Sequence, residues 1–87
     1  MAKGDKQPTV KHLSDAEIDQ IFARIGKTLS ERKKQIDITL DHLAYESGVS
    51  RSTLTRMLAG EEINVRNLLK VAYSLNLTID QLISFKK

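Results

Sequence analysis

Residues 40–60 read LDHLAYESGVSRSTLTRMLAG, a stretch that predicts two short helices joined by a tight turn. Gly48 stands where the chain must reverse, because glycine adopts the left-handed backbone conformation at no steric cost. Val49 is expected to fill the angle between the helices, and the hydroxyl of Ser50 is placed to cap the second helix. Ala44 in the first helix is small enough to let the second cross closely. The stretch therefore predicts a pair of crossed helices in close contact.

The second helix of this pair has two different faces. Leu54, Met57 and Leu58 share an apolar face that is expected to point inward. The opposite face carries basic and hydroxyl side chains at the i, i+1, i+4, i+5 spacing of one helical surface, namely Arg51, Ser52, Thr55 and Arg56. No acidic residue occurs between positions 50 and 59. This face is therefore a candidate surface for an anionic partner such as nucleic acid.

Composition limits the class of protein. The chain has 87 residues, enough for one small domain, and a net charge of +3, which is compatible with nucleic acid but is weak evidence alone. It contains no cysteine, which excludes a disulfide scaffold and a thiolate metal site and favours a cytoplasmic location. No apolar run exceeds three residues, so we expect no membrane span.

A long first helix is predicted upstream of this pair. Ser14 and Glu17 have the spacing of a capping box, which marks a helix start. Apolar residues then recur every three or four positions, and nothing stops the pattern before about Lys34, so the helix is expected to span about 31 Å. Gly26 inside it is expected to cost about 1 kcal/mol relative to alanine. Residues 14–24 are expected to pack on the fourth and fifth helices of their own domain, with a second subunit as the alternative.

Two further helices are predicted after the pair. Asn64 caps the fourth helix, and Thr78 caps a short fifth one. We expect the fourth helix to direct inward Val65, Leu68, Leu69, Ala72 and Leu75, and the fifth to carry Ile79, Leu82 and Ile83. Asn76 is suited to a left-handed position between them. The chain is thus predicted to be all-α, with a flexible basic tail over residues 1–12 and a five-helix domain over residues 13–87.

Taken in order, these segments resemble the Cro-like and phage-repressor-like helix-turn-helix family of bacterial and phage regulators. The similarity runs from about Ile25 to Ile83 and rests on Ile38-Thr39-x-x-x-Leu43-Ala44, Gly48-Val49-Ser50-Arg51-Ser52-Thr53-Leu54-x-Arg56, Asn64-Val65-x-x-Leu68-Leu69-Lys70-Val71-Ala72 and Leu75-Asn76-Leu77-Thr78-Ile79-Asp80-Gln81-Leu82. It implies a five-helix lambda-repressor-like DNA-binding domain with an extended first helix. The helix-turn-helix proper would occupy residues 39–59.

The resemblance implies a sequence-specific transcriptional regulator that occupies an operator in double-stranded DNA. The residues expected to contact DNA are Thr39, Ser50, Arg51, Ser52, Thr53, Thr55, Arg56 and Lys33. Arginine suits guanine O6 and N7 or a phosphate, because its planar fork donates two parallel hydrogen bonds. Thr53 equally suits a structural position between the helices.

Several positions depart from the family pattern. Leu40 stands where relatives often have a DNA-contacting glutamine, and Ala59 stands near the end of helix three, where many relatives have Glu-Asn-Gly. The loop that follows, often basic in the family, contains Glu61 and Glu62. These departures keep open a protein-interaction module that has lost DNA binding. Within the DNA-binding class, the length is similar to that of restriction–modification controller proteins, and the antitoxin of a toxin–antitoxin pair is the other alternative.

One recognition helix reads only a few base pairs, so we expect a homodimer on a palindromic operator. Apolar residues near the C-terminus are the predicted self-contact: Leu77, Leu82, Ile83 and Phe85. We expect no enzyme, because the four glycines are scattered at positions 4, 26, 48 and 60 and no H-E-x-x-H motif occurs. No metal ligand set, cofactor or small-molecule ligand is predicted.

Overall fold

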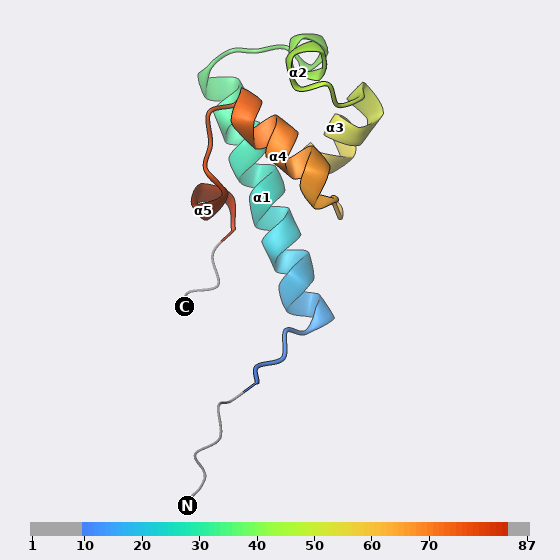
Figure 1. Cartoon of the computed structure of the whole chain (residues 1–87), viewed down its shortest axis with the longest axis vertical. Coiled ribbons are helices and arrows are strands. Elements are labelled where there is room, and N and C mark those ends of the chain that lie inside the picture. The colour runs from blue at the N-terminus through green and yellow to red at the C-terminus, as the bar shows by residue number, and fades with distance from the viewer. Residues whose placement is uncertain (1–9, 84–87) are drawn as a thin grey trace, which may run out of the picture.

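A computed structural model of the chain describes residues 10–83, which form five α-helices and no strand (Figure 1). The helices are α1 (Asp15–Gln35), α2 (Leu40–Ser47), α3 (Arg51–Leu58), α4 (Val65–Ser74) and α5 (Ile79–Leu82). The all-α architecture with a long first helix is therefore confirmed. Most of the predicted basic tail over residues 1–12, and Phe85 of the predicted self-contact, lie outside the described residues.

Every helix begins directly after a residue whose side-chain oxygen accepts a hydrogen bond from a backbone N–H three residues later. These N-cap residues are Ser14, Thr39, Ser50, Asn64 and Thr78. The predicted capping box is present, since the Ser14 hydroxyl accepts from the Glu17 N–H at 3.1 Å and Glu17 Oε1 accepts from the Ser14 N–H at 2.9 Å. A local signal thus fixes where each helix starts.

The turns between the helices use left-handed backbone positions. Gly48 has φ 73° and ends α2, and Asn76 has φ 59° after α4, so both predictions are confirmed. Asp37, with φ 56°, takes the same conformation between α1 and α2, which the sequence pattern did not indicate. Aspartate tolerates this region better than most side chains, because its short polar group can hydrogen-bond locally.

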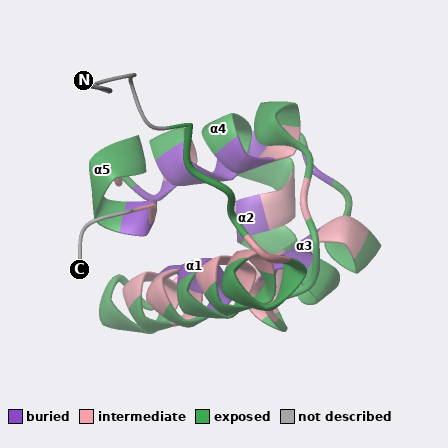
Figure 2. Ribbon diagram, turned by 90° about the horizontal axis from the view of Figure 1, so that it is seen from below, coloured by how far each residue is buried: buried purple, intermediate pink, exposed green. Residues whose placement is uncertain are grey.

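The buried core lies between the helices (Figure 2). Its members are Ile25, Leu29, Leu43, Val49, Leu54, Met57, Leu68, Val71, Ala72, Leu75 and Leu82. The predicted inward face of α4 is wrong at two positions, because Val65 and Leu69 are 68% and 49% exposed, whereas Val71 is fully buried. Apolar residues occupy more than one face of α4, and contact with the rest of the domain decides which face is covered.

The long helix α1 packs against α3 and α5, and Ile21 and Phe22 of its N-terminal half contact the core cluster. These two side chains therefore pack on their own domain, but α1 lies mainly against α3 and α5 and not, as predicted, against α4 and α5. The alternative contact with a second subunit stays a prediction. Near the other end of α1, Arg32 Nε donates to the Leu75 carbonyl oxygen at 2.9 Å, which ties α1 to the end of α4. In Figure 1 α4 passes in front of α1, and Figure 2 shows the two helices on opposite sides of the domain. The N-terminal turns of α1 extend beyond the other helices in Figure 1.

At Gly26, α1 lies close to the end of α3. A Cβ atom at this position would lie 2.7 Å from the backbone nitrogen of Gly60, 2.8 Å from its Cα and 2.8 Å from the carbonyl oxygen of Met57. Those neighbours are all backbone atoms, which cannot rotate away. The glycine that costs helix propensity is therefore required by packing.

None of the helices within residues 10–83 is long and apolar enough to cross a lipid bilayer.

Candidate nucleic-acid interface

The core anchors α3 through one face only. Leu54 and Met57 are 0% and 1% exposed, and Val49 just before the helix is 4% exposed. Helices α1 and α2 both pack against α3. The buried Ser47 hydroxyl accepts a hydrogen bond from the Val49 N–H at 3.2 Å, which holds the turn between α2 and α3. These contacts fix the direction in which the opposite face of α3 points.

That opposite face is open to solvent, as predicted. Arg51, Ser52, Thr55 and Arg56 are all exposed and lie next to one another around the helix. Thr53 is half-buried at the margin of this face. We call the four exposed residues the outward face of α3. The structure therefore brings together the basic and hydroxyl side chains that the sequence spacing placed on one surface.

Some hydroxyl groups near this face have partners within the domain. The Ser50 hydroxyl accepts from the Thr53 N–H at 3.2 Å and donates to Thr53 Oγ1 at 2.9 Å. Thr55 Oγ1 donates to the Arg51 carbonyl oxygen at 2.9 Å. Ser50 and Thr53 thus have a local structural role at the start of α3, in addition to the predicted contact with DNA.

Arg51 is paired with an acid from the neighbouring helix. Its Nε lies 2.9 Å from Oδ1 of Asp41, and the two side chains are 67% and 75% exposed. Asp41 lies in the first turn of α2 and Arg51 in the first turn of α3, so the pair joins the two helices on the outside. The sequence spacing does not indicate this partner, because the pair joins two helices across a turn.

Arg56 has no ion-pair partner among residues 10–83 and extends from the last turn of α3. The chain then turns sharply, with the Glu61 N–H donating to the Arg56 carbonyl oxygen at 3.0 Å. Glu61 and the neighbouring Glu62 are both exposed. Their negative charges therefore lie just beyond the basic face.

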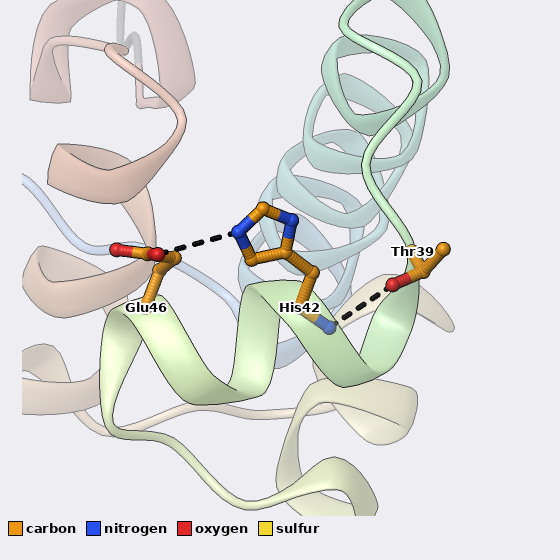
Figure 3. A network of polar contacts seen from close by, with 3 residues as sticks. All are labelled: Thr39, His42 and Glu46. Carbon is orange, nitrogen blue, oxygen red and sulfur yellow. Dashed lines mark hydrogen bonds and ion pairs between the residues drawn. The ribbon is translucent and has the colours of Figure 1, made fainter.

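Thr39 caps α2 and lies next to a second polar pair on that helix (Figure 3). Its Oγ1 accepts from the His42 N–H at 3.0 Å, and His42 Nε2 lies 3.3 Å from Oε2 of Glu46. The Thr39 hydroxyl proton remains a donor that suits a phosphate oxygen. Leu40 is half-buried against the core, so the residue that departs from the family pattern has a packing role.

Lys33 is half-buried near the C-terminal end of α1. It lines an open hollow of about 310 Å³ together with residues that include Ile38 and Leu58. Leu58 is the last residue of α3. Lys33 therefore lies beside the end of α3 and is not part of its outward face, a position that suits a backbone phosphate better than a base.

The residues predicted for self-association have different environments. Leu82 is 3% exposed and belongs to the core of its own domain, so it offers a second subunit almost no surface. Leu77 and Ile83 are half-buried and pack against the core from its margin. Among the described residues of this set, only Leu77 and Ile83 can therefore offer apolar surface to a second subunit.

A family model described as the Cro/C1-type helix-turn-helix DNA-binding domain matches residues 28–87. The matched span covers well over half of the chain and includes all of α2, α3, α4 and α5. The N-terminal half of α1 precedes it. Comparisons with curated proteins and with solved structures gave no match.

Proposed function

Because the chain belongs to the Cro/C1-type helix-turn-helix DNA-binding family, we propose that it is a sequence-specific transcriptional regulator that binds double-stranded DNA as a homodimer. The observation that carries this proposal is the outward face of α3, which is basic, free of acids of its own and fixed in direction by the buried opposite face. We assign the chain no catalytic step, because the family is one of DNA-binding domains.

In this proposal α3 enters the major groove. Arg51 and Arg56 reach base edges, where guanine O6 and N7 accept the paired donors of one guanidinium group. Ser52 and Thr55 contact neighbouring base edges or a thymine methyl group. Lys33 and Thr39, which lie off this face, contact phosphates and set the register of the protein on the duplex.

Two copies are needed because one helix of this length reads only a few base pairs. A twofold dimer places its two α3 helices in half-sites separated by about 34–36 Å, one turn of B-form DNA. The proposed operator is therefore a palindrome with this spacing, and regulation follows from occupying it.

A binding experiment tests the DNA-binding role directly. Duplexes selected from a random pool by the protein are labelled, and affinity is measured by fluorescence anisotropy at several salt concentrations. Arg56→Ala should weaken binding to the selected duplex by about 1–3 kcal/mol, since the arginine is expected to make a paired contact to a base. Arg24→Ala, an equal change of charge on the exposed surface of α1, should leave base discrimination unchanged.

The outcomes separate the alternatives. Binding that neither Arg51→Ala nor Arg56→Ala weakens would remove α3 as the reading helix. If no duplex shows salt-dependent binding, a protein-interaction module becomes the better interpretation. Glu61, Glu62 and the neutralised Arg51 are the features that favour that module.

A further inference from the structure

The ion pair between α2 and α3 involves the inner end of the Arg51 guanidinium group. The contact joins Nε of Arg51 to Oδ1 of Asp41 at 2.9 Å. A guanidinium group has five N–H donors, of which Nε carries one and the two Nη atoms carry four. Nε lies at the inner end of the group, nearer the chain, so a carboxylate bound there leaves the outer Nη fork available. That fork is the part that matches guanine O6 and N7.

We propose that Asp41 is a positioning residue, which holds the Arg51 guanidinium so that its outer fork faces a guanine edge and thereby sets base specificity at that position. This inference rests on the proposed DNA-binding function. Asp41 itself touches no base in this scheme and acts through Arg51.

The solvent exposure of Asp41 and Arg51 argues against a mainly structural role for their ion pair. The two side chains are 67% and 75% exposed, and ion pairs that accessible contribute little to folding stability. A free arginine side chain has many rotamers, and binding through a fork requires one of them. Restraining Nε before DNA arrives reduces the entropy lost on binding, which is the general benefit of preorganisation.

The charge of Asp41 adds a second effect. Its carboxylate repels DNA phosphates, which lowers the affinity for any duplex regardless of sequence. It also competes with phosphates for the Arg51 side chain, so Arg51 is less free to turn toward the backbone. The first effect lowers the affinity for every duplex alike and leaves the ratio of specific to non-specific binding unchanged. The second effect raises that ratio, because it disfavours contacts of Arg51 with the backbone.

The test compares two isosteric neutralisations on the same helix. Asp41→Asn removes the carboxylate that contacts α3, whereas Glu46→Gln removes one that contacts His42 within α2. Each variant is titrated against the selected duplex, against an unrelated duplex, and against the selected duplex with a substitution at the base pair where Arg51→Ala loses discrimination. A thermal melt verifies that each variant is folded.

Asp41→Asn should reduce discrimination at that one base pair by roughly five- to tenfold. This reduction is part of the discrimination that a paired arginine–guanine contact provides. It should also tighten binding to the unrelated duplex by a few-fold, because a repulsive charge is removed. Glu46→Gln should reproduce the second change but not the first. In an Arg51→Ala background, Asp41→Asn should have no further effect on discrimination.

Unchanged discrimination in Asp41→Asn, or additive losses in the double variant, would overturn the positioning role. Loss of discrimination spread over every base pair would overturn it as well, since that pattern indicates a general electrostatic effect. Failure of the unmodified protein to prefer any duplex would instead remove the proposed function, so the two failures are distinguishable.

Discussion

At the scale of single residues, Gly26 and Gly48 need a glycine for different physical reasons. Gly48 has φ 73°, but a Cβ there would meet no atom within 4 Å. Gly26 lies in ordinary helix, yet a Cβ there would lie 2.7–2.8 Å from backbone atoms of Gly60 and Met57. One position is constrained by backbone conformation and the other by the approach of another segment.

Gly26→Ala should therefore destabilise the domain even though alanine is the better helix former. The gain in helix propensity is about 1 kcal/mol, whereas overpacking a close contact costs about 1–3 kcal/mol. Thermal unfolding followed by circular dichroism measures the difference, and each 1 kcal/mol corresponds to a shift in Tm of about 4–8 °C for a domain of this size.

The matched control is Ala16→Gly, at an exposed position of the same helix, which should show only the propensity cost. A Gly26→Ala variant that melts above the parent would show that α1 and the end of α3 can move apart without loss of stability.

The sequence pattern identified Gly48, because the residues around a turn between two helices are enough to indicate it. The pattern could indicate only the propensity cost of Gly26 and not its packing role, because the contact depends on a residue 34 positions away.

At the scale of elements, the helix boundaries follow from short-range chemistry. The five caps from Ser14 to Thr78 were predictable because each satisfies N–H groups within its own first turn. The covered face of α4 was not, because Val65 and Leu69 fit the helical period as well as Leu68 and Val71 do. The Asp41–Arg51 contact was missed for a related reason, since it joins two elements across a turn.

The N-terminal half of α1, which precedes the family match, is expected to stabilise the domain. Ile21 and Phe22 contact the core cluster and would be lost with it. Phe22→Ala should lower the free energy of unfolding by about 1–3 kcal/mol, less than for a fully buried phenylalanine because this one is half-buried. Chemical denaturation gives the value directly.

Gln20→Ala, at an exposed position two residues earlier, serves as the control and should be close to neutral. Deleting the residues before Arg24 should also lower the stability of the domain, as Phe22→Ala does. The deletion should lower stability more than it lowers dimer affinity. A deletion that melts like the parent but sediments as a monomer would assign this half-helix to the subunit interface.

At the scale of the whole molecule, the proposed dimer makes a prediction about its C-terminal side. Ile83 is half-buried at the margin of the core. We therefore expect a charge at this position to disrupt the contact between subunits more than the fold of one subunit. Ile83→Glu should remain helical by circular dichroism, sediment as a monomer and lose operator affinity, because a single half-site is too short for tight binding.

Leu69→Glu provides the comparison, since Leu69 is 49% exposed and shares the outer side of α4 with Val65. We expect this variant to remain a dimer. The opposite pattern, a dimeric Ile83→Glu and a monomeric Leu69→Glu, would move the self-contact from the C-terminal segment to α4.

The division of α3 into a buried face and an outward face also has an evolutionary consequence. Leu54 and Met57 hold the helix in the domain, while Arg51, Ser52, Thr55 and Arg56 are exposed. Substitutions at exposed positions usually change stability by less than about 0.5 kcal/mol. A lineage can therefore vary these four residues one at a time, with every intermediate still folded. Under the proposed function, a new target sequence is therefore acquired by changes on one surface that leave the fold intact.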